Sequence, residues 1–296
     1  MPRYMGIESP SDCPYELLAL IGSGGCADVY SAIHPGRPFE PVAVKVQKPG
    51  PIARQRFRRE IDILRRLDHP HVMPLIEAGS RDDWYAMPLA DGTLQTFRNT
   101  NPSDWEGLRI ALSGICGALL HAHANGVVHR DGSPSNILWT PGYHGPHWLL
   151  SDFGLARTSH SSKSLTPAGA LFGTPGFAAP EIHHDPRMAT PLSDTYSIGA
   201  IARWFTNISL DQSATSAQGR YWSELIRNTV AFVPQERWPV TRIAQHLEAQ
   251  PVADRVLLVE NTPARLWDAP FCTRCGASAG HDGAGRCARC GFMDEL

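Results

Sequence analysis

A lysine and a glutamate stand in apolar surroundings, where each needs a partner. Lys45 lies in the alternating run Val42–Val46, on the same face as Ala43. Fifteen residues later, Glu60 shares the apolar face of a helical pattern with Phe57. Because a charge inside a Val-rich strand is costly unless it is paired or faces a ligand, the two residues are natural partners. The alternative for Lys45 alone is an edge strand that leaves its ammonium group in water.

Carboxylate and amide side chains gather in two stretches farther along the chain. Asp131 ends the run His129–Asp131, and Asn136 follows it five residues later. Asp152 opens the triplet Asp152–Gly154. Hard oxygen ligands of this kind suit Mg²⁺ that bridges phosphates. A lone Asp-Phe-Gly is more often a turn, but two such loops that can converge beneath a nucleotide are a more specific indication.

A glycine-rich turn near the N-terminus offers a place for phosphates. The stretch Ile21–Val29 contains Gly22, Ser23, Gly24 and Gly25 between two strand-like runs. Glycine lets the backbone approach a phosphate closely and point its N–H groups at it. Any tight hairpin could use the same glycines, so this turn gains weight only beside the lysine and the carboxylates.

Strands in the first third of the chain and helices after it would position these side chains. Strands are expected at Tyr15–Ile21, Val29–Ile33, Val42–Val46, His71–Ala78 and Trp84–Leu89, with one helix among them at Ile52–Leu67. Further helices are expected at Trp105–Ala124, Ser193–Thr206, Tyr221–Phe232 and Val240–Gln250, and loops over roughly 129–192. Ser103 or Asp104 would cap the long helix. Strands first and helices after is the pattern of an α+β protein with two lobes.

In their order along the chain, these motifs resemble those of the eukaryotic-type Ser/Thr protein kinase family, over about residues 13–250. The resemblance implies a two-lobed kinase fold with a small β-rich lobe and a mostly helical lobe. It also implies ATP, Mg²⁺ or Mn²⁺, and a protein substrate. Two further stretches fit the family pattern: Tyr85–Gly92 as the hinge between the lobes and Gly173–Glu181 as the end of the activation loop. The Gly-Thr-Pro form of the second stretch favours Ser/Thr over Tyr specificity.

The resemblance assigns catalytic and metal-binding roles to five residues. Lys45 would contact the α- and β-phosphates, with Glu60 holding it in place. Asp131 would orient the attacking hydroxyl and accept its proton. Asn136 and Asp152 would hold Mg²⁺.

The resemblance also implies a set of nucleotide-binding residues and two structural contacts. The set comprises Gly22, Ser23, Gly24, Gly25, Val29, Ala43, Lys45, Met87, Pro88 and Ala90. Met87 would be the gatekeeper, and Pro88 would use its carbonyl, since proline lacks only the N–H group. Asp194 would brace the catalytic loop, and Arg237 would pair with Glu181.

The chain departs from the family pattern in three places. Ala27 replaces the third glycine of the turn, and Asn207–Arg220 is polar, which predicts a short or irregular segment where the family has a docking helix. Gly132 and Ser133 replace an apolar residue and a lysine after Asp131. Losing that cation removes electrostatic stabilisation of the transition state. Because the other residues are present, an active kinase is favoured over a pseudokinase scaffold that only binds nucleotide.

Two Cys-x-x-Cys turns, each followed by glycine, stand eleven residues apart near the C-terminus. Their thiolates, from Cys272, Cys275, Cys287 and Cys290, predict a zinc ribbon with one tetrahedral Zn²⁺. A redox pair and bound iron are the alternatives, and no thioredoxin-like βαβ pattern surrounds the motif. Docking of a partner or substrate is the favoured role. Nearby arginines leave nucleic acid as a less favoured partner.

Composition bounds these interpretations. The chain has 296 residues, of which 42% are hydrophobic and 19% charged, and its net charge is −2. A near-neutral chain has no overall attraction to nucleic acid or anionic membranes. The absence of a long apolar run or a secretory signal predicts a cytoplasmic protein with no membrane partner. The expected segments are an N-terminal extension at 1–12, a kinase domain at 13–250, a linker at 251–270 and the zinc ribbon at 271–296.

Overall fold

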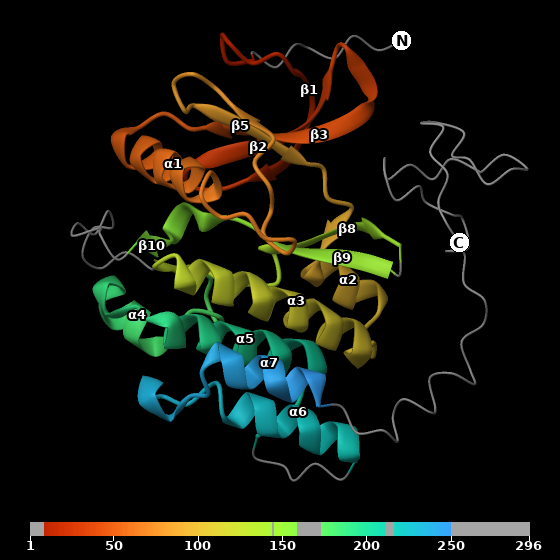
Figure 1. Ribbon diagram of the computed structural model, residues 1–296, viewed down its shortest axis with the longest axis vertical. Helices are drawn as coiled ribbons and strands as arrows, with labels where there is room; N and C mark the ends of the chain where they lie inside the picture. The colour runs from red at the N-terminus through yellow and green to blue at the C-terminus, as the bar shows by residue number, and fades with distance from the viewer. Residues whose placement is uncertain (1–8, 144, 159–172, 211–215, 250–296) are drawn as a thin grey trace, which may run out of the picture.

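The computed structural model describes residues 9–143, 145–158, 173–210 and 216–249. Figure 1 shows two lobes in these segments, one built on a twisted sheet and the other on stacked helices. The α+β architecture with a β-rich small lobe and a helical large lobe is therefore confirmed. The segment 271–296, with its four cysteines, lies outside the described residues, and so does the expected linker at 251–270.

The small lobe is a five-stranded antiparallel sheet in the order β1-β2-β3-β5-β4. Its strands are β1 (Glu16–Ser23), β2 (Ala27–His34), β3 (Arg37–Gln47), β4 (Glu77–Ala78) and β5 (Trp84–Pro88). The register places Lys45 opposite Val29 on one neighbouring strand and opposite Tyr85 on the other. Lys45 is therefore on a central strand, which removes the edge-strand alternative.

Helix α1 (Pro51–Leu64) packs beside this sheet, as Figure 1 shows. It starts with proline at its first turn, where the missing N–H costs nothing. Phe57 and Ile61 are buried on the face that carries Glu60. The predicted amphipathic helix thus exists and turns a carboxylate inward together with its apolar residues.

The large lobe is a stack of helices around the long central α3 (Trp105–Ala124). The others are α2 (Leu94–Thr100), α4 (Pro180–His184), α5 (Pro191–Thr206), α6 (Ala217–Arg227) and α7 (Val240–Glu248). Asp104 caps α3 by accepting a hydrogen bond from the Gly107 N–H at 2.8 Å, one of the two predicted caps. Helix α6 begins four residues before the prediction, because Ser216 caps it by accepting from the Gly219 N–H at 2.9 Å.

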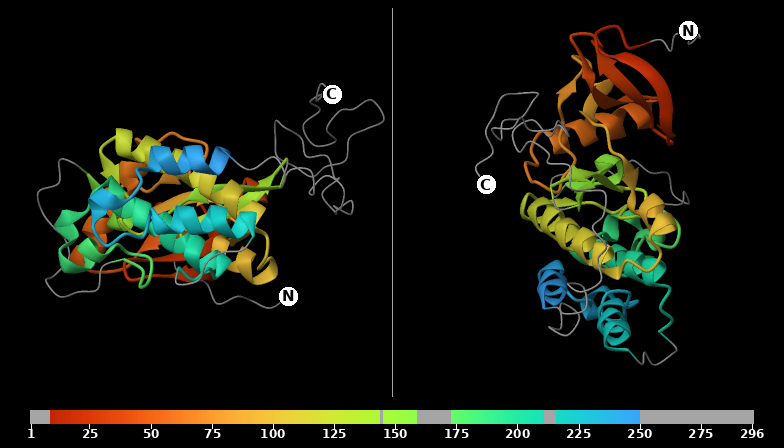
Figure 2. Two further views of the ribbon diagram at one scale, coloured as in Figure 1. Left: turned by 90° about the horizontal axis from the view of Figure 1, so that it is seen from below. Right: turned by 90° about the vertical axis from the view of Figure 1, so that its right-hand side faces the viewer.

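The expectation of loops throughout 129–192 is wrong for part of that range. Strands β8 (Ile137–Gly142) and β9 (Gly145–Leu150) form a hairpin there, with the two-residue strand β6 (Gly92–Thr93) added at its edge. The right-hand view of Figure 2 shows this hairpin between the small-lobe sheet and the helices. Leu149 and Leu150 are buried in the main core, and that burial outweighs the turn-forming Pro141 and Gly142.

The predicted strand at His71–Ala78 is also largely wrong. Only Glu77–Ala78 pairs in the sheet, and Val72 makes a single bridge to Leu150. Pro74 interrupts the run, because proline cannot donate to a ladder. The apolar residues Val72 and Met73 are buried, but they pack into the core that α1 shares with the large lobe.

Short elements complete the described chain. They are β7 (Val127–Val128), β10 (Arg157–Thr158) and the 3₁₀ turns η1 (Phe153–Leu155), η2 (Pro186–Met188) and η3 (Pro234–Glu236). At the N-terminal end, Asp12 accepts hydrogen bonds from the Ser80 N–H and the Trp84 indole, which ties this part of the chain to the small lobe. Among the described helices, none has the length and apolar character needed to cross a bilayer.

Candidate active site

Lys45 lies at the centre of a three-residue charge network between the lobes. Its Nζ is 2.7 and 2.9 Å from the two carboxylate oxygens of Glu60 and 3.3 Å from Oδ1 of Asp152. Burial disfavours the charged lysine, but the carboxylates of Asp152 and Glu60 raise the pKa of Lys45 well above 10.5. The Lys45 ammonium in turn lowers the pKa of Asp152. The predicted pairing of Lys45 with Glu60 is present, and the Lys45 ammonium group also contacts Asp152.

Tyr85 also belongs to this network, although no sequence pattern predicted its contact with Glu60. Its hydroxyl donates to Glu60 Oε1 at 2.9 Å, and burial raises its pKa well above 10. Burial also raises the pKa of Glu60. The β3–β5 register, which places Tyr85 opposite Lys45, is the only signal that could have revealed the contact.

The loop that carries Asp131 is held to the end of the activation segment. Asp131 Oδ1 accepts from both the backbone N–H and the hydroxyl of Thr174, each at 2.8 Å. The Asn136 amide donates to the Asp131 carbonyl at 2.8 Å and to its Oδ2 at 3.2 Å. Burial raises the pKa of Asp131, and the hydrogen bonds from Thr174 oppose that rise. The contact between Thr174 and Asp131 is a second one that the sequence did not predict.

Asp194 anchors the same loop to helix α5. Its Oδ2 accepts from the His129 N–H at 2.9 Å, and its Oδ1 accepts from the Arg130 N–H at 2.8 Å. His123 Nε2 lies 2.7 Å from Oδ2. Burial acts against the charged form, but these hydrogen bonds keep the pKa of Asp194 below its usual value. The predicted bracing contact is therefore present.

Two residues of the site have a strained backbone. Arg130 has a φ of 70° and Asp152 a φ of 60°. Both values lie in the left-handed backbone region, which residues other than glycine rarely adopt. Arg130 is held there by bonds from its guanidinium group to the carbonyls of Leu155 and Pro186, at 2.6 and 3.1 Å. The Phe153 ring packs edge-on against His129, 4.7 Å between centroids. These contacts connect the Asp131 loop with the segment that carries Asp152.

The glycine-rich turn lies at the open edge of the small lobe. Gly24 closes it by donating to the Ala27 carbonyl at 2.9 Å. Lys48, another residue not anticipated, spans the turn: its Nζ donates to the Gly24 carbonyl at 2.7 Å and lies 3.0 Å from Asp28. A Cβ at Gly25 would meet no described atom within 4 Å, so the described protein itself does not require glycine there.

The residues expected around adenine converge where β2, β3 and β5 meet. Met87 and Pro88 end β5 and pair with Ala43 and Val42 of β3. Ala43 and Met87 are buried, and Val29 packs against the same core. Ala90 follows in the connection to the large lobe, beside Asp91, whose N–H donates to the Trp139 carbonyl at 2.9 Å. The expected cofactor-binding residues thus lie on adjoining elements.

The site fits a nucleotide with a divalent cation. The open space at Gly25 leaves room for phosphates beside the backbone, and Lys45 supplies a positive charge. The lowered pKa of Asp152 keeps its carboxylate ionised. Asn136 uses its amide nitrogen on Asp131, which leaves its side-chain oxygen for a cation. Strand pairing of Ile137 with Leu150 brings Asn136 and Asp152 to the same end of the hairpin.

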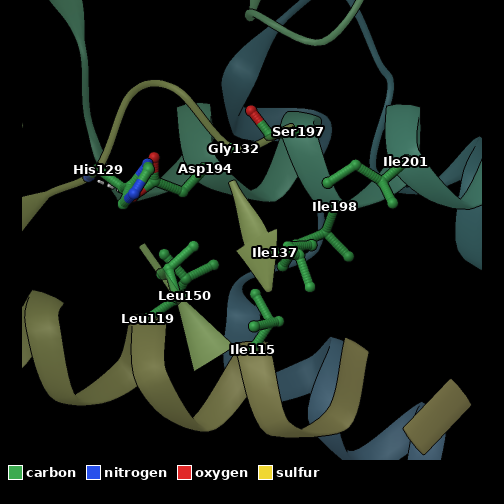
Figure 3. Close-up of a pocket in the computed structure, with 10 residues that line it drawn as sticks. All are labelled: Ile115, Leu119, His129, Gly132, Ile137, Leu150, Asp194, Ser197, Ile198 and Ile201. Atoms are coloured by element: carbon green, nitrogen blue, oxygen red, sulfur yellow. Dashed lines mark hydrogen bonds between the residues drawn. The ribbon is translucent and has the colours of Figure 1, made fainter. Parts of the chain in front are cut away.

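A small cavity of about 10 Å³ lies beneath the Asp131 loop, lined mainly by isoleucine and leucine (Figure 3). Gly132 and Ser197 meet at its rim, where a Cβ at Gly132 would lie 2.8 Å from Ser197 Cβ. Glycine thus stands where the family resemblance implies an apolar residue, at a point where α5 leaves no room for a Cβ. Next to it, Ser133 is buried, and its hydroxyl has no hydrogen-bond partner in the described part of the chain.

Far from the nucleotide side, Glu181 and Arg237 form the predicted structural pair. Both carboxylate oxygens of Glu181 accept from the Arg237 guanidinium at 2.8 Å. Burial opposes ionisation, but the bonds from Arg237 and Ser193 hold the pKa of Glu181 below its usual 4.5. The pair joins the start of α4 to the turn before α7.

Comparison with known proteins defines the class. A family model described as protein kinase domain matches residues 15–246, so the chain belongs to the protein kinase domain family. Within the described residues, no cluster of three or more histidine, cysteine or acidic residues is arranged to hold a metal ion. The zinc-binding prediction falls on residues outside that part of the chain.

The curated relatives that the chain matches include serine/threonine-protein kinases of bacteria. It is 36% identical over 196 residues to the DNA damage-responsive serine/threonine-protein kinase RqkA of Deinococcus radiodurans, covering 63% of this chain and 29% of that protein. It is 35% identical over 199 residues to the serine/threonine-protein kinase PknH of Mycobacterium tuberculosis, covering 64% and 30%. With PknF of the same species, identity is 30% over 258 residues, covering 82% and 48%. The chain thus spans less than half the length of each of these relatives.

Proposed function

We propose that the chain is an ATP-dependent Ser/Thr protein kinase, which transfers the γ-phosphoryl group to hydroxyl groups of proteins. The observation that carries the proposal is that one site contains both Lys45 of strand β3, held by Glu60 and Asp152, and Asp131 of the adjoining loop, held by Thr174 and Asn136. The relatives described above are all serine/threonine-protein kinases, which supports the same reaction.

In the proposed reaction, Lys45 binds and orients the phosphates of ATP from the small lobe. Asp131 orients the acceptor hydroxyl and takes its proton as the hydroxyl oxygen forms a bond to the γ-phosphorus. The bond between the γ-phosphorus and the bridging oxygen breaks, and ADP leaves with that electron pair. Mg²⁺ or Mn²⁺, held by Asn136 and Asp152, would neutralise phosphate charge. Thr174 keeps the Asp131 carboxylate aimed at the acceptor.

The direct test is incubation of the purified full chain with labelled ATP, Mg²⁺ or Mn²⁺ and a generic protein substrate. Asp131→Asn should lower kcat by about 10²- to 10⁴-fold, the contribution of a positioned general base. The Asp131→Asn variant should still bind ATP, as measured by a thermal shift assay. Ser133 motivates the competing hypothesis of a pseudokinase, because it supplies no charge where the family has a lysine. Nucleotide binding by the wild type without any transfer would favour that hypothesis.

We propose as a second element that Cys272, Cys275, Cys287 and Cys290 bind one structural Zn²⁺, and that this module docks a partner or substrate in the cytoplasm. Paired Cys-x-x-Cys turns supply the four thiolates that tetrahedral zinc prefers. Elemental analysis should find about one zinc per chain, lost with Cys272→Ser. A native disulfide or bound iron would contradict this assignment. If the wild type binds nucleic acid and loses this binding when the zinc is removed, the module would instead serve to recognise nucleic acid.

A further inference from the structure

A cleft of about 530 Å³ lies in the large lobe beside the end of the activation segment. Its walls come from Pro175–Phe177, from the C-terminal half of α5 and from α2. The Phe177 and Trp204 rings meet edge-on, 6.1 Å between centroids. None of the described residues that line the cleft is acidic, whereas Arg98 and Arg203 both line it. The cleft therefore combines an aromatic wall with two positive charges.

Both arginines lack a carboxylate partner in the described part of the chain. Arg203 is exposed on α5 and forms no ion pair with a described residue. Arg98 stacks its guanidinium over the Trp204 ring at 4.5 Å and donates through Nε to the Phe205 carbonyl at 3.2 Å. The stack uses the face of the guanidinium group and leaves its terminal nitrogens for another acceptor.

The cleft is tied to the reacting residues through both of its walls. The Phe177 N–H donates to the Thr174 carbonyl at 3.0 Å, and Thr174 donates to Asp131. On the other side, the Gln95 N–H of α2 donates to the Pro134 carbonyl of the Asp131 loop at 3.3 Å. A peptide that presents a hydroxyl to Asp131 would therefore place its flanking residues close to the cleft.

We infer that this cleft binds an acidic segment of the protein substrate, flanking the phosphorylated Ser or Thr, through Arg203 and Arg98. The inference rests on the proposed kinase function and adds the substrate's charge to it. Carboxylates match the planar donor edge of arginine, and the Phe177–Trp204 wall accepts the apolar part of the segment. Because Arg203 is exposed, it adds modest affinity but discriminates against basic segments at low salt.

The test uses fluorescent peptides that contain one serine and one variable residue, which is Glu, Gln or Lys. The variable residue is placed in turn at each position on both sides of the serine. Equilibrium binding without ATP is measured by anisotropy at low salt, and kcat/KM is measured with ATP. At the best position, the wild type should prefer Glu over Gln by about fivefold, the scale of an exposed ion pair. Arg203→Gln should bring the Glu and Gln peptides to equal affinity, and Arg203→Glu should reverse the preference towards Lys.

Arg227→Gln is the matched control, since Arg227 is an exposed arginine on α6 outside the cleft. Its preference for Glu should stay at the wild-type value. Arg98→Gln should weaken the preference as well, but Arg203 carries the test because Arg98 also packs on Trp204. Equal binding of Glu and Gln peptides by the wild type, or an equal loss in Arg227→Gln, would overturn the inference. Displacement of the Glu peptide by inorganic phosphate alone at similar concentration would also overturn it, because the cleft would then be a simple anion site.

Binding and turnover separate this inference from the proposed function. Charge-selective binding that depends on Arg203, with no transfer to any peptide, would support the cleft and reject the kinase reaction. Transfer to all peptides without regard to charge would support the kinase reaction and reject the cleft assignment.

Discussion

Two buried ion pairs in the described part of the chain, Lys45–Glu60 and Arg237–Glu181, differ in whether the cation has a donor left for a ligand. Arg237 is fully buried and uses all five of its N–H donors, on the two Glu181 oxygens and the carbonyls of Ala231, Leu192 and Phe232. Lys45 binds Glu60 but also reaches Asp152, which is expected to hold the metal ion. A closed pair has no donor left for a ligand, so it can only serve the fold. The Lys45 pair faces the site and keeps its charge where a nucleotide would lie.

This difference predicts opposite consequences for the two cations. Lys45→Met should lower phosphoryl transfer by about 10²- to 10³-fold, the scale of removing one electrostatic stabiliser of the transition state. The thermal midpoint should fall by less than in Arg237→Met, because burial raises the pKa of Glu60, which can take up a proton in place of its cation, and because the Asp152 side chain is partly exposed. Initial rates and differential scanning fluorimetry on the same preparation measure both effects. Near wild-type turnover would show that Lys45 does not contact the phosphates.

Arg237→Met should produce the reverse pattern. It leaves the Glu181 carboxylate and three backbone carbonyls without their donor, which should cost about 3–5 kcal/mol of unfolding free energy. The activity per folded molecule, measured below the melting transition, should stay near the wild-type value. Arg227→Met, at an exposed position, is the control for losing an arginine. A large loss of turnover without a loss of stability would mean that the Glu181 pair acts on the site after all.

A smaller effect is expected at Ser133, on the acceptor side of the site. Ser133→Lys should raise kcat by about tenfold if it restores about 1.4 kcal/mol of transition-state stabilisation. Ser133→Met adds a side chain of similar length without the charge, and it should lower or preserve kcat. An equal change in both variants would show that volume in this buried position, rather than charge, limits the reaction.

Both ion pairs could be predicted from the sequence, whereas contacts that depend on the strand register could not. Lys45 and Glu60 were paired because each needs a partner in apolar surroundings. Glu181 and Arg237 were paired because the family resemblance implies the contact. The sequence did not predict the contacts that Tyr85, Thr174 and Lys48 make at the site. Their spacing along the chain does not indicate which residues the strand register and the activation segment bring next to them. The β8–β9 hairpin was missed because the turn-forming residues Pro141, Gly142 and Pro146 lie within its paired strands, and only the end near Ile137 and Leu150 is buried. The cleft between α2 and α5 depends on tertiary packing and has no signature along the chain.

The smallest expected effect is the pH dependence of stability that arises from Glu181 in its pair with Arg237. Bonds from Arg237 hold the pKa of Glu181 below its usual 4.5. A carboxyl group with a lowered folded-state pKa adds stability above its unfolded pKa and loses it as pH falls through the folded value. The wild type should therefore exceed Glu181→Gln in urea midpoint at neutral pH, and this gap should close as pH falls below about 4.5. In an Arg237→Met background, burial still opposes ionisation of Glu181, so Glu181→Gln should be neutral or stabilising at neutral pH, and any such gain should shrink as acid protonates Glu181. A gap that stays constant from neutral pH into the acid range in the wild-type background would mean that Glu181 stabilises the fold by hydrogen bonding alone, without its charge.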